Sequence, residues 1–503
     1  FIALPIYVNY VAAKDNTFSQ YGIKYPNQTS SQSDVFQNTY THQKPNTMFC
    51  YFMRPLFSKN LGGMGGNSNY IKIFPEIGQG IKHQDNNRYD LAILPEWGDG
   101  TDNVVGELPS TIDYKLQTLD LQNSYRLHEY DNYQGITTEY EYDYEPEEDT
   151  DRQCDISLWA SLKATRHRYR LDYSRGAYSG ITRHTTVLFN PQIEVTYAWD
   201  ENRKKLDLEY ELSQKSPDMV SFVDVENNTD PLNIHCGNPD LKNNTTHNLS
   251  FSYTDNSTKR EATFSSKLTY HASVNDIAYA YTYDRNTGVR HYRPQNINGN
   301  YWLYGYATYS TPLDKARHLT LYNSITANYD HGVDFISEDA AVVPMRSNVN
   351  RWRGTETMRL IYKFGKHTLG LKGSIDGSRV TSSRSDFESF SVCSFNFGLT
   401  ALVKLPLKME LSTDLTMYSR RGYATGSSNA NDLVWNGRLA KSLPKLGLTF
   451  MLDGFDILNQ LSNVTNVINS QGRTETYRNS LPRYVMAHVI YKINHKPGKT
   501  NKP

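Results

Sequence analysis

The sequence predicts an all-β fold: a transmembrane, antiparallel β-barrel of the outer-membrane type with an even number of strands. Three observations indicate this fold. Apolar and polar residues alternate along many segments, these segments are long, and short turns alternate with long polar loops between them. Strands of about 9–11 residues cross a bilayer at a tilt, and outer-membrane barrels have short turns at one end and long loops at the other.

The alternation has a period of two residues. Leu206, Leu208 and Tyr210 alternate with Asp207 and Glu209, which gives the segment one apolar and one polar face. The same period recurs in 185–199, 260–283, 316–329, 408–420 and 446–457. A soluble β-sandwich also has one apolar face per strand, so the period alone leaves that class open. A row of carboxylates favours a barrel, because a wet lumen tolerates such a row and a dry interior does not.

The strands can be counted back from the C-terminal end. We expect 16 directly, an even number that suits closure, and up to about 22 in all. Their ranges are 111–128, 131–143, 156–173, 185–199, 204–213, 246–254, 260–283, 299–311, 316–329, 350–363, 367–379, 389–404, 408–420, 430–442, 446–457 and 483–493.

The predicted connections fall into two classes. Short turns are expected near Asn202, Asn256, Leu313, Gly365, Pro406 and Pro444. Long polar loops are expected at 214–245, 284–298, 330–349, 380–388, 421–429 and 458–481. The barrel therefore spans 111–493. Residues 1–110 are poorly patterned and are expected to hold the first barrel strands and loops, with candidate strands at 1–11, 48–58 and 68–74. A basic tail follows at 494–503.

Composition excludes several classes of protein. The 53 basic and 53 acidic residues cancel, whereas nucleic-acid-binding proteins usually carry a basic excess. No apolar run reaches the roughly 18 residues of a transmembrane helix, but barrel strands need no such run. The 38 tyrosines favour strands and membrane interfaces.

Motifs for catalysis or metal binding are missing from the sequence. The four cysteines form no C-x-x-C pair, and the chain contains neither H-E-x-x-H nor G-x-S-x-G. We therefore expect no enzyme, no cofactor and no metal site.

Two short motifs resemble a known family. The first is Gly237-Asn238-Pro239-Asp240-Leu241, and the second is Asp456-Ile457-Leu458-Asn459-Gln460 before the last strand. Over about 155–493 the chain resembles the barrel of TonB-dependent receptor-like proteins of the Bacteroidota, the outer membrane protein beta-barrel family. The resemblance implies a barrel of about 22 strands that imports a bulky ligand. It also implies a plug domain before the barrel.

The chain departs from the family at two places. Residues 1–110 are too few for both a plug and six strands, so we expect no plug within this chain. The last strand ends in Ile493 rather than an aromatic residue. The first departure weakens the expectation of active import.

Tyrosines gather around the loop at 284–298. They suggest a sugar- or peptide-binding platform, or an aromatic belt at the outer membrane interface. The weak ligand-binding candidates are Tyr279, Tyr281, Tyr283, Tyr301, Trp302 and Tyr304.

Other candidates each have a structural alternative. Gly237 to Leu241 could contact ligand, or could shape the backbone where a loop re-enters the wall. The cluster Arg166, His167, Arg168 and Arg170 could bind anions such as lipopolysaccharide phosphates, or pair with the acidic rows. An acidic run, 139–151, suggests a solvated turn on the periplasmic side or a cation-binding segment. It includes Glu145, Glu147, Glu148 and Asp149.

Three functions remain open at this point. The leading hypothesis is a receptor-like transport barrel in the cell outer membrane, in contact with outer-membrane lipids and lipopolysaccharide. The alternative is a plug-less structural or assembly subunit of a larger outer-membrane complex. Surface lipoproteins or other complex subunits are the expected partners, and nucleic acid is not. The third hypothesis is a soluble β-rich adhesin.

Overall fold

The computed structural model describes most of the chain. The described residues are 2–3, 6–24, 34–44, 46–62, 67–101, 106–110, 113–144, 154–284, 286–336, 345–384, 387–422, 429, 431–461, 464–469, 472–477 and 483–492. Their regular structure is almost entirely strand, and α1 (Tyr114–Gln117) is the one α-helix among them. No helix in these ranges is long and apolar enough to cross a bilayer.

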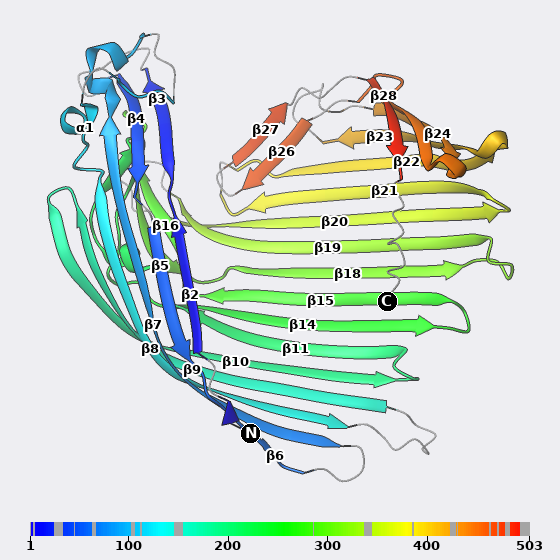
Figure 1. Ribbon diagram of the computed structural model, residues 1–503, viewed down its shortest axis with the longest axis horizontal. Helices are drawn as coiled ribbons and strands as arrows, with labels where there is room; N and C mark the ends of the chain where they lie inside the picture. The colour runs from blue at the N-terminus through cyan, green and yellow to red at the C-terminus, as the bar shows by residue number, and fades with distance from the viewer. Residues whose placement is uncertain are drawn as a thin grey trace, which may run out of the picture.

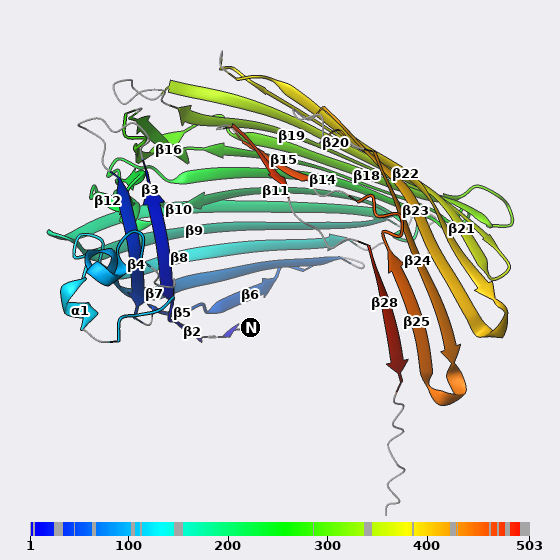
Figure 2. The same ribbon diagram turned by 90° about the horizontal axis from the view of Figure 1, so that it is seen from above.

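One antiparallel sheet of 22 strands forms the wall of the molecule. Figures 1 and 2 show that this sheet curls round on itself. Within the described residues, β1, β2 and β3 together form one edge and β28 forms the other, because each of these strands has one strand neighbour. The strands are β1 (Ile2–Ala3), β2 (Ile6–Ala13), β3 (Asn16–Ile23), β4 (Val35–Gln43), β5 (Asn46–Met53), β6 (Leu56–Asn60), β7 (Ser68–Asp90), β8 (Tyr125–Tyr144), β9 (Cys154–Arg175), β10 (Tyr178–Trp199), β11 (Lys204–Lys215), β14 (Asn244–Ser257), β15 (Ala262–Val274), β18 (Tyr301–Pro312), β19 (Leu319–Ile336), β20 (Met345–Phe364), β21 (His367–Ser382), β22 (Phe390–Leu405), β23 (Met409–Arg421), β24 (Asn431–Leu443), β25 (Leu448–Phe455) and β28 (Tyr484–Tyr491).

The first six strands are pieces of two longer lines. β4, β5 and β6 follow one another and pair in turn with the single strand β7, and β3, β2 and β1 pair with them on the far side. A break lies at Arg54 and Pro55, where proline has no N–H to donate to the ladder. The line β1, β2, β3 and the line β4, β5, β6 therefore form one long antiparallel hairpin with short breaks in each line.

The strand register places apolar residues of one strand opposite apolar residues of the next. Leu208 of β11 lies opposite Val195 of β10 and Phe251 of β14, and Phe251 lies opposite Leu268 of β15. Leu208, Phe251 and Leu268 are exposed. We call this the outer face. The opposite, inner face carries Asp207, which accepts hydrogen bonds from Thr196 Oγ1 at 2.7 Å and Ser252 Oγ at 3.1 Å. An apolar outside and a polar inside are the arrangement of a membrane barrel.

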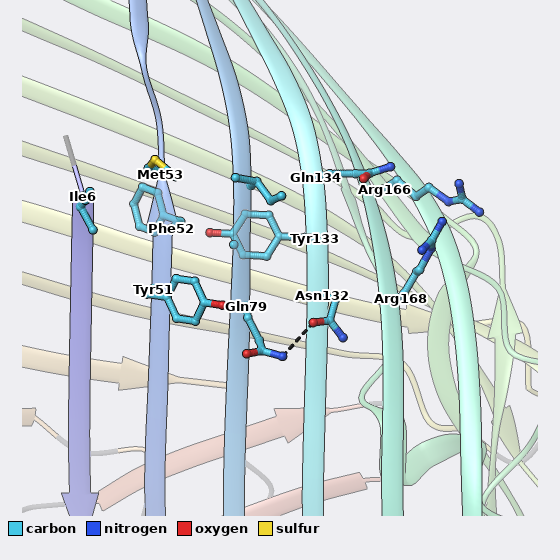
Figure 3. A pocket seen from close by; sticks show the side chains of 12 residues that line it. Ile6, Tyr51, Phe52, Met53, Gln79, Asn132, Tyr133, Gln134, Arg166 and Arg168 are labelled. Carbon is cyan, nitrogen blue, oxygen red and sulfur yellow. Dashed lines mark hydrogen bonds between the residues drawn. The ribbon is translucent and has the colours of Figure 1, made fainter. Parts of the chain in front are cut away.

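The same alternation divides the predicted arginine cluster. His167 lies on the inner face, where its Nδ1 is 3.0 Å from Asp131 Oδ1. Arg166, Arg168 and Arg170 alternate with it and lie on the outer face, exposed. Figure 3 shows Arg166 and Arg168 on β9 beside residues of β8, β7 and β5. His167 and the arginines on either side of it therefore lie on opposite faces of the wall.

Most connections sort by length to the two ends of the wall, and the two-residue turn between β9 and β10 is an exception. All six predicted short turns are confirmed between the strands that flank them. Left-handed backbone supports several of them, as at Asn202 (φ 60°), Gly365 (φ 57°) and Gly447 (φ 63°). We call this the turn end and the opposite end the loop end. Outer-membrane barrels place their longer loops outside the cell, which assigns the loop end to the exterior.

Four connections at the loop end contain secondary structure of their own. A four-stranded sheet consists of β12 (Asn227–Asp230), β13 (Asn233–His235), β17 (Arg290–Ile297) and β16 (Asp276–Tyr283). The 3-10 helix η3 (Met219–Phe222) precedes it. Between β7 and β8 lie η1 (Leu91–Ile93), η2 (Pro95–Trp97) and α1. A separate hairpin joins β26 (Val464–Asn469) and β27 (Gly472–Tyr477).

Two strand predictions are wrong. The predicted strand 111–128 is instead α1 followed by a turn, and β8 begins only at Tyr125. Asp113 caps α1 and Asp120 accepts from the backbone N–H of Asn123, so local side chains stabilise a folded connection. The predicted strand 260–283 is two strands that break at Asn275, whose φ is +54°. β15 stays in the wall and β16 joins the four-stranded sheet.

The first 110 residues and the long loops hold more strands than predicted. β7 runs to Asp90, well past the predicted end at residue 74. Its second half, from His83 to Arg88, is polar on both faces and so lacks an alternating signal. The predicted loops 214–245, 284–298 and 458–481 contain β12, β13, β17, β26 and β27. The predicted tail 494–503 lies outside the described residues.

Candidate functional site

A polar pocket of about 450 Å³ lies on the inner face at the loop end. We call it the vestibule pocket. The strands β3, β4, β7 and β9 contribute to it, together with the loop that contains β12. Hydroxyl and amide side chains line most of it, among them Ser19, Gln37, Thr39, Asn86 and Asn123. Such a lining can hydrogen-bond a polar ligand from several directions.

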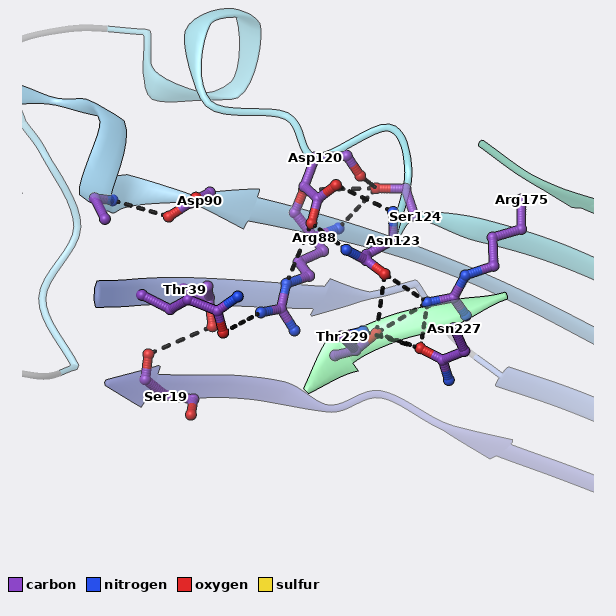
Figure 4. Close-up of polar contacts among 12 residues, drawn as sticks. Ser19, Thr39, Arg88, Asp90, Asp120, Asn123, Ser124, Arg175, Asn227 and Thr229 are labelled. Carbon is purple, nitrogen blue, oxygen red and sulfur yellow. Dashed lines mark hydrogen bonds and ion pairs between the residues drawn. The ribbon is translucent and has the colours of Figure 1, made fainter. Parts of the chain in front are cut away.

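Arg175, the last residue of β9, is 6% exposed at the edge of this pocket. One terminal nitrogen donates to Asn123 Oδ1 at 2.8 Å, Asn227 Oδ1 at 2.5 Å and Thr229 Oγ1 at 2.9 Å, as Figure 4 shows. All three partners are neutral. The guanidinium is therefore positioned by hydrogen bonds while its charge stays uncompensated by any contacting carboxylate among the described residues.

Arg88 of β7 is the second buried cation, at 7% exposure. Its Nη2 donates to Gln37 Oε1 at 3.3 Å, and its Nε lies 3.4 Å from Asp120 Oδ2. Neither Arg88 Nε nor Arg175 Nε makes a hydrogen bond within the described protein. A buried charge needs compensation. Within the described residues Asp120 contacts Arg88, no carboxylate contacts Arg175, and Asp230 is the one acidic residue that lines the pocket. The vestibule pocket is therefore suited to an anionic, oxygen-rich group.

A second pocket of about 340 Å³ adjoins the first and shares Tyr125, Arg175 and Asn227 with it. His235 of β13 and Tyr279 of β16 also line this pocket. The His235 ring stacks on Tyr292 with centroids 4.8 Å apart and meets Tyr279 edge-on at 6.0 Å. Burial lowers the pKa of His235, so the ring is neutral at neutral pH.

An apolar cluster fixes the loop that forms these pockets. Met219 and Phe222 of η3 are buried against Leu171 of β9, which is fully buried, and against Leu241. Phe222 also stacks on His184 of β10 with centroids 4.6 Å apart. Burying each Met or Phe side chain contributes about 1.5–3 kcal/mol. The loop is thereby held against the inner face rather than extending from the wall.

The Gly237 to Leu241 motif joins this loop to its neighbours. A Cβ on Gly237 would lie 2.1 Å from the carbonyl oxygen of Val223, so only glycine fits. The Asn238 backbone N–H donates to Ser221 O at 2.7 Å, and its side-chain amide donates to Pro294 O at 2.8 Å. Asp240 N donates back to Asn238 Oδ1 at 3.0 Å. These contacts favour the backbone-shaping interpretation.

The second motif, Asp456 to Gln460, directly follows the end of β25. Asp456, at φ +43°, accepts hydrogen bonds from the backbone N–H groups of Gln460 and Leu461, both at 3.0 Å. Asn459 is also left-handed, at φ +55°, and accepts from Arg483 N at 3.4 Å just before β28. This motif too shapes the backbone between two wall strands.

The predicted aromatic residues do not form one platform. Tyr279, Tyr281 and Tyr283 lie on β16, in the four-stranded sheet. Tyr301, Trp302 and Tyr304 lie on β18, where the register puts Tyr301 on the outer face and the other two on the inner face. Trp302 stacks on His271 with centroids 5.1 Å apart. Of the six, Tyr279 lines the second pocket.

No group of three or more His, Cys, Asp or Glu residues that could hold a metal occurs in the described part of the chain. Cys50, Cys154, Cys236 and Cys393 are free thiols. The acidic residues Glu145, Glu147, Glu148 and Asp149 lie outside the described residues.

The sequence analysis missed both buried arginines. Arg88 sits in the unpatterned half of β7, so nothing in the local sequence marked it as inward-facing. Arg175 is the last inward-facing residue of β9 and directly precedes Gly176, whose φ is +56°. A strand that ends in arginine directly before a tight turn is the one signal that could have drawn attention to it.

Comparison with a family model agrees with the architecture. A model of the outer membrane protein beta-barrel family matches residues 168–491. Among solved structures, the chain is similar to the copper transporter OprC at 8% identity and a TM-score of 0.38, covering 96% of this chain and 78% of that one. It is also similar to BauA, the ferric preacinetobactin receptor from Acinetobacter baumannii, at 8% identity and a TM-score of 0.39, covering 97% and 79%. No curated protein sequence matches significantly.

Proposed function

The chain belongs to the outer membrane protein beta-barrel family, and we propose that it is a TonB-dependent receptor-like barrel that binds a bulky, anionic ligand in the vestibule pocket. The barrel lies in the cell outer membrane. The loop end faces the exterior, so a ligand from outside reaches this pocket first. The proposal is one of binding and uptake, and assigns no chemistry to the chain.

The pair Arg88 and Arg175 carries the proposal. Both guanidinium groups are buried at the edge of an open pocket, and neither Nε makes a hydrogen bond within the described residues, although Arg88 Nε lies 3.4 Å from Asp120 Oδ2. Carboxylate, sulfate or phosphate oxygens would accept these hydrogens and compensate the charge. The surrounding hydroxyl and amide groups would bind the remaining polar atoms of a larger molecule.

Calorimetry with matched sugars tests this proposal. Oligogalacturonate is the anionic probe, and a malto-oligosaccharide of equal length is the neutral one. We expect the purified barrel to bind the first more tightly, and Arg88→Ala and Arg175→Ala each to weaken binding about tenfold, since hydrogen bonds to charged groups contribute about 1.5–3 kcal/mol. Lys315→Ala, in a turn at the far end, is the control with the same charge change. Equal binding of both sugars, or arginine variants with unchanged affinity, contradicts the proposal.

A second candidate function is a structural or assembly subunit. The connection between β7 and β8 favours it, because Leu91 and Trp97 of this loop pack in an apolar cluster against Tyr40 of β4 and Tyr89 of β7. Such a preformed surface at the loop end suits a surface lipoprotein or another complex subunit. Purification from native membranes in mild detergent tests it. Stoichiometric partner chains support a platform, and an isolated barrel opposes it.

A further inference from the structure

The outer face of β7 to β10 changes character along its length. From the turn end upward, Leu162 and Ala164 of β9 are followed by Arg166, and Ile136 of β8 is followed by Gln134. The register places these positions side by side, because Ile136 pairs with Ala164 and Gln134 pairs with Arg166. The apolar band therefore ends at one line across β8 and β9, while on β10 it reaches Val187, the partner of Arg166. Such a line marks the edge of the hydrocarbon layer on a barrel.

A row of arginines lies directly beyond this line. Arg166 and Arg168 of β9 and Arg183 of β10 are all exposed on the outer face. Within the described residues none of the three has a carboxylate partner. Arg170 differs, because it forms a bidentate pair with Asp172 at 2.9 and 3.0 Å. The row therefore presents three unpaired positive charges at the height of the lipid headgroups.

The arginines also lie close to one another. Arg183 is the direct cross-strand partner of Arg170. Arg168 is the next outward-facing residue of β9, two positions before Arg170. Like charges opposite each other destabilise a sheet unless an anion lies between them. Asp172 compensates Arg170 in this pair, whereas Arg166, Arg168 and Arg183 have no carboxylate in contact within the described residues.

A shallow groove of about 460 Å³ extends the row sideways over the outer face (Figure 3). At one side it is lined by Arg166 and Arg168, with the amides of Asn132 and Gln134 beside them. At the other side Ile77 and further apolar residues of β2 and β5 form the lining. A charged side and an apolar side fit an amphiphile that carries a phosphate next to acyl chains.

We propose that Arg166, Arg168 and Arg183 bind the phosphate groups of lipid A, the phosphorylated glycolipid anchor of lipopolysaccharide, with an acyl chain lying in the groove. Arginine matches phosphate with paired N–H donors, which favours this residue over lysine at such a site. The loop end faces the exterior, and lipid A occupies that leaflet of the outer membrane. This site lies on the opposite face of the wall from the vestibule pocket and does not depend on ligand uptake.

Native mass spectrometry of the barrel in lipid nanodiscs tests the proposal. Bisphosphorylated lipid A is compared with enzymatically dephosphorylated lipid A and with phosphatidylglycerol. We expect the wild-type barrel to retain bisphosphorylated lipid A at least fivefold more than either alternative. The triple variant R166A/R168A/R183A is expected to lose this preference. A triple variant at the turn end, K315A/K366A/K445A, removes the same charge and is expected to keep it.

A variant that is expected to bind more lipid A controls for loss of binding through misfolding. Asp172→Asn removes the partner of Arg170 and adds a fourth free arginine to the row, so retention of lipid A is expected to rise at least twofold. Three results overturn the proposal: equal retention of dephosphorylated lipid A, equal retention of phosphatidylglycerol, or unchanged retention by the triple variant R166A/R168A/R183A. A decrease in Asp172→Asn also overturns it.

Discussion

Arg175, at the loop end of β9, donates a hydrogen bond of 2.5 Å to Asn227. Asn227 lies in the loop that folds back over the inner face. The two residues are 52 positions apart in the sequence. This bond ties the wall to the loop that forms both pockets. The buried arginine is thus part of the loop's anchorage as well as of the proposed binding site.

Arg175→Met is expected to loosen the loop and leave the wall intact. The change removes the hydrogen bonds from the charged donor, while Asn123 Oδ1 and Asn227 Oδ1 still accept from Thr229 Oγ1, so we expect a total cost of about 1.5–3 kcal/mol. Limited proteolysis should then cut within 216–243 faster than in the wild type, while heat-modifiable gel migration stays the same. Unchanged proteolysis would mean that Arg175 anchors nothing.

Gly237→Ala is expected to displace η3. The added Cβ would meet the Val223 carbonyl at 2.1 Å, and both partners are backbone, so relief requires movement of the loop. Overpacking of this kind costs about 1–3 kcal/mol. Hydrogen exchange should speed up in 219–241. Gly377→Ala, whose Cβ meets nothing within 4 Å, is the matched control and should exchange as the wild type does.

Asp456→Ala is expected to weaken the closing hairpin. Two backbone N–H groups lose their acceptor, and alanine is strained at a φ of +43°. We expect a loss of about 1–3 kcal/mol in denaturant unfolding of the detergent-solubilised barrel. Asp456→Asn keeps one acceptor oxygen and tolerates positive φ, so its loss should be smaller. Equal losses in the two variants would show that the side-chain acceptor is unimportant.

The turn after β18 should depend on pH. The backbone N–H of Leu319 donates to Asp314 at 2.7 Å, and this bond lowers the pKa of the carboxyl. Because the folded-state pKa is depressed, the bond stabilises the turn above the ordinary aspartate pKa and is lost as the pH falls through the folded value. The amide resonance of Leu319 in a leucine-labelled sample should therefore titrate with a midpoint below the ordinary aspartate value. A midpoint at or above that value contradicts this account.

The wall strands could be predicted because their alternation directly reflects the environment on each face. Leu208 and Asp207 differ in exposure to lipid and to the interior, and that difference is visible in the sequence at a period of two. The short turns were equally visible, since Gly365 and Gly447 adopt left-handed backbone that few other residues tolerate.

The loop end could not be predicted in the same way. β16 continues the alternation of β15, and only the left-handed backbone at Asn275 shows that the two strands enter different sheets. Arg88 and Arg175 come together through contacts between distant segments that no local period encodes. The arginines of β9 stand out in the sequence, but their separation from His167 required knowing which face points inward.

Site-directed spin labelling of β14 in a lipid bilayer tests the central claim most directly. In a background without the four native cysteines, single cysteines replace Phe251, on the outer face, and Ser250, its neighbour on the inner face. The account predicts that the label at 251 is accessible to oxygen dissolved in lipid and shielded from a water-soluble nickel reagent. The label at 250 should show the reverse. Equal accessibility of both labels to the water-soluble reagent would contradict a membrane-spanning wall.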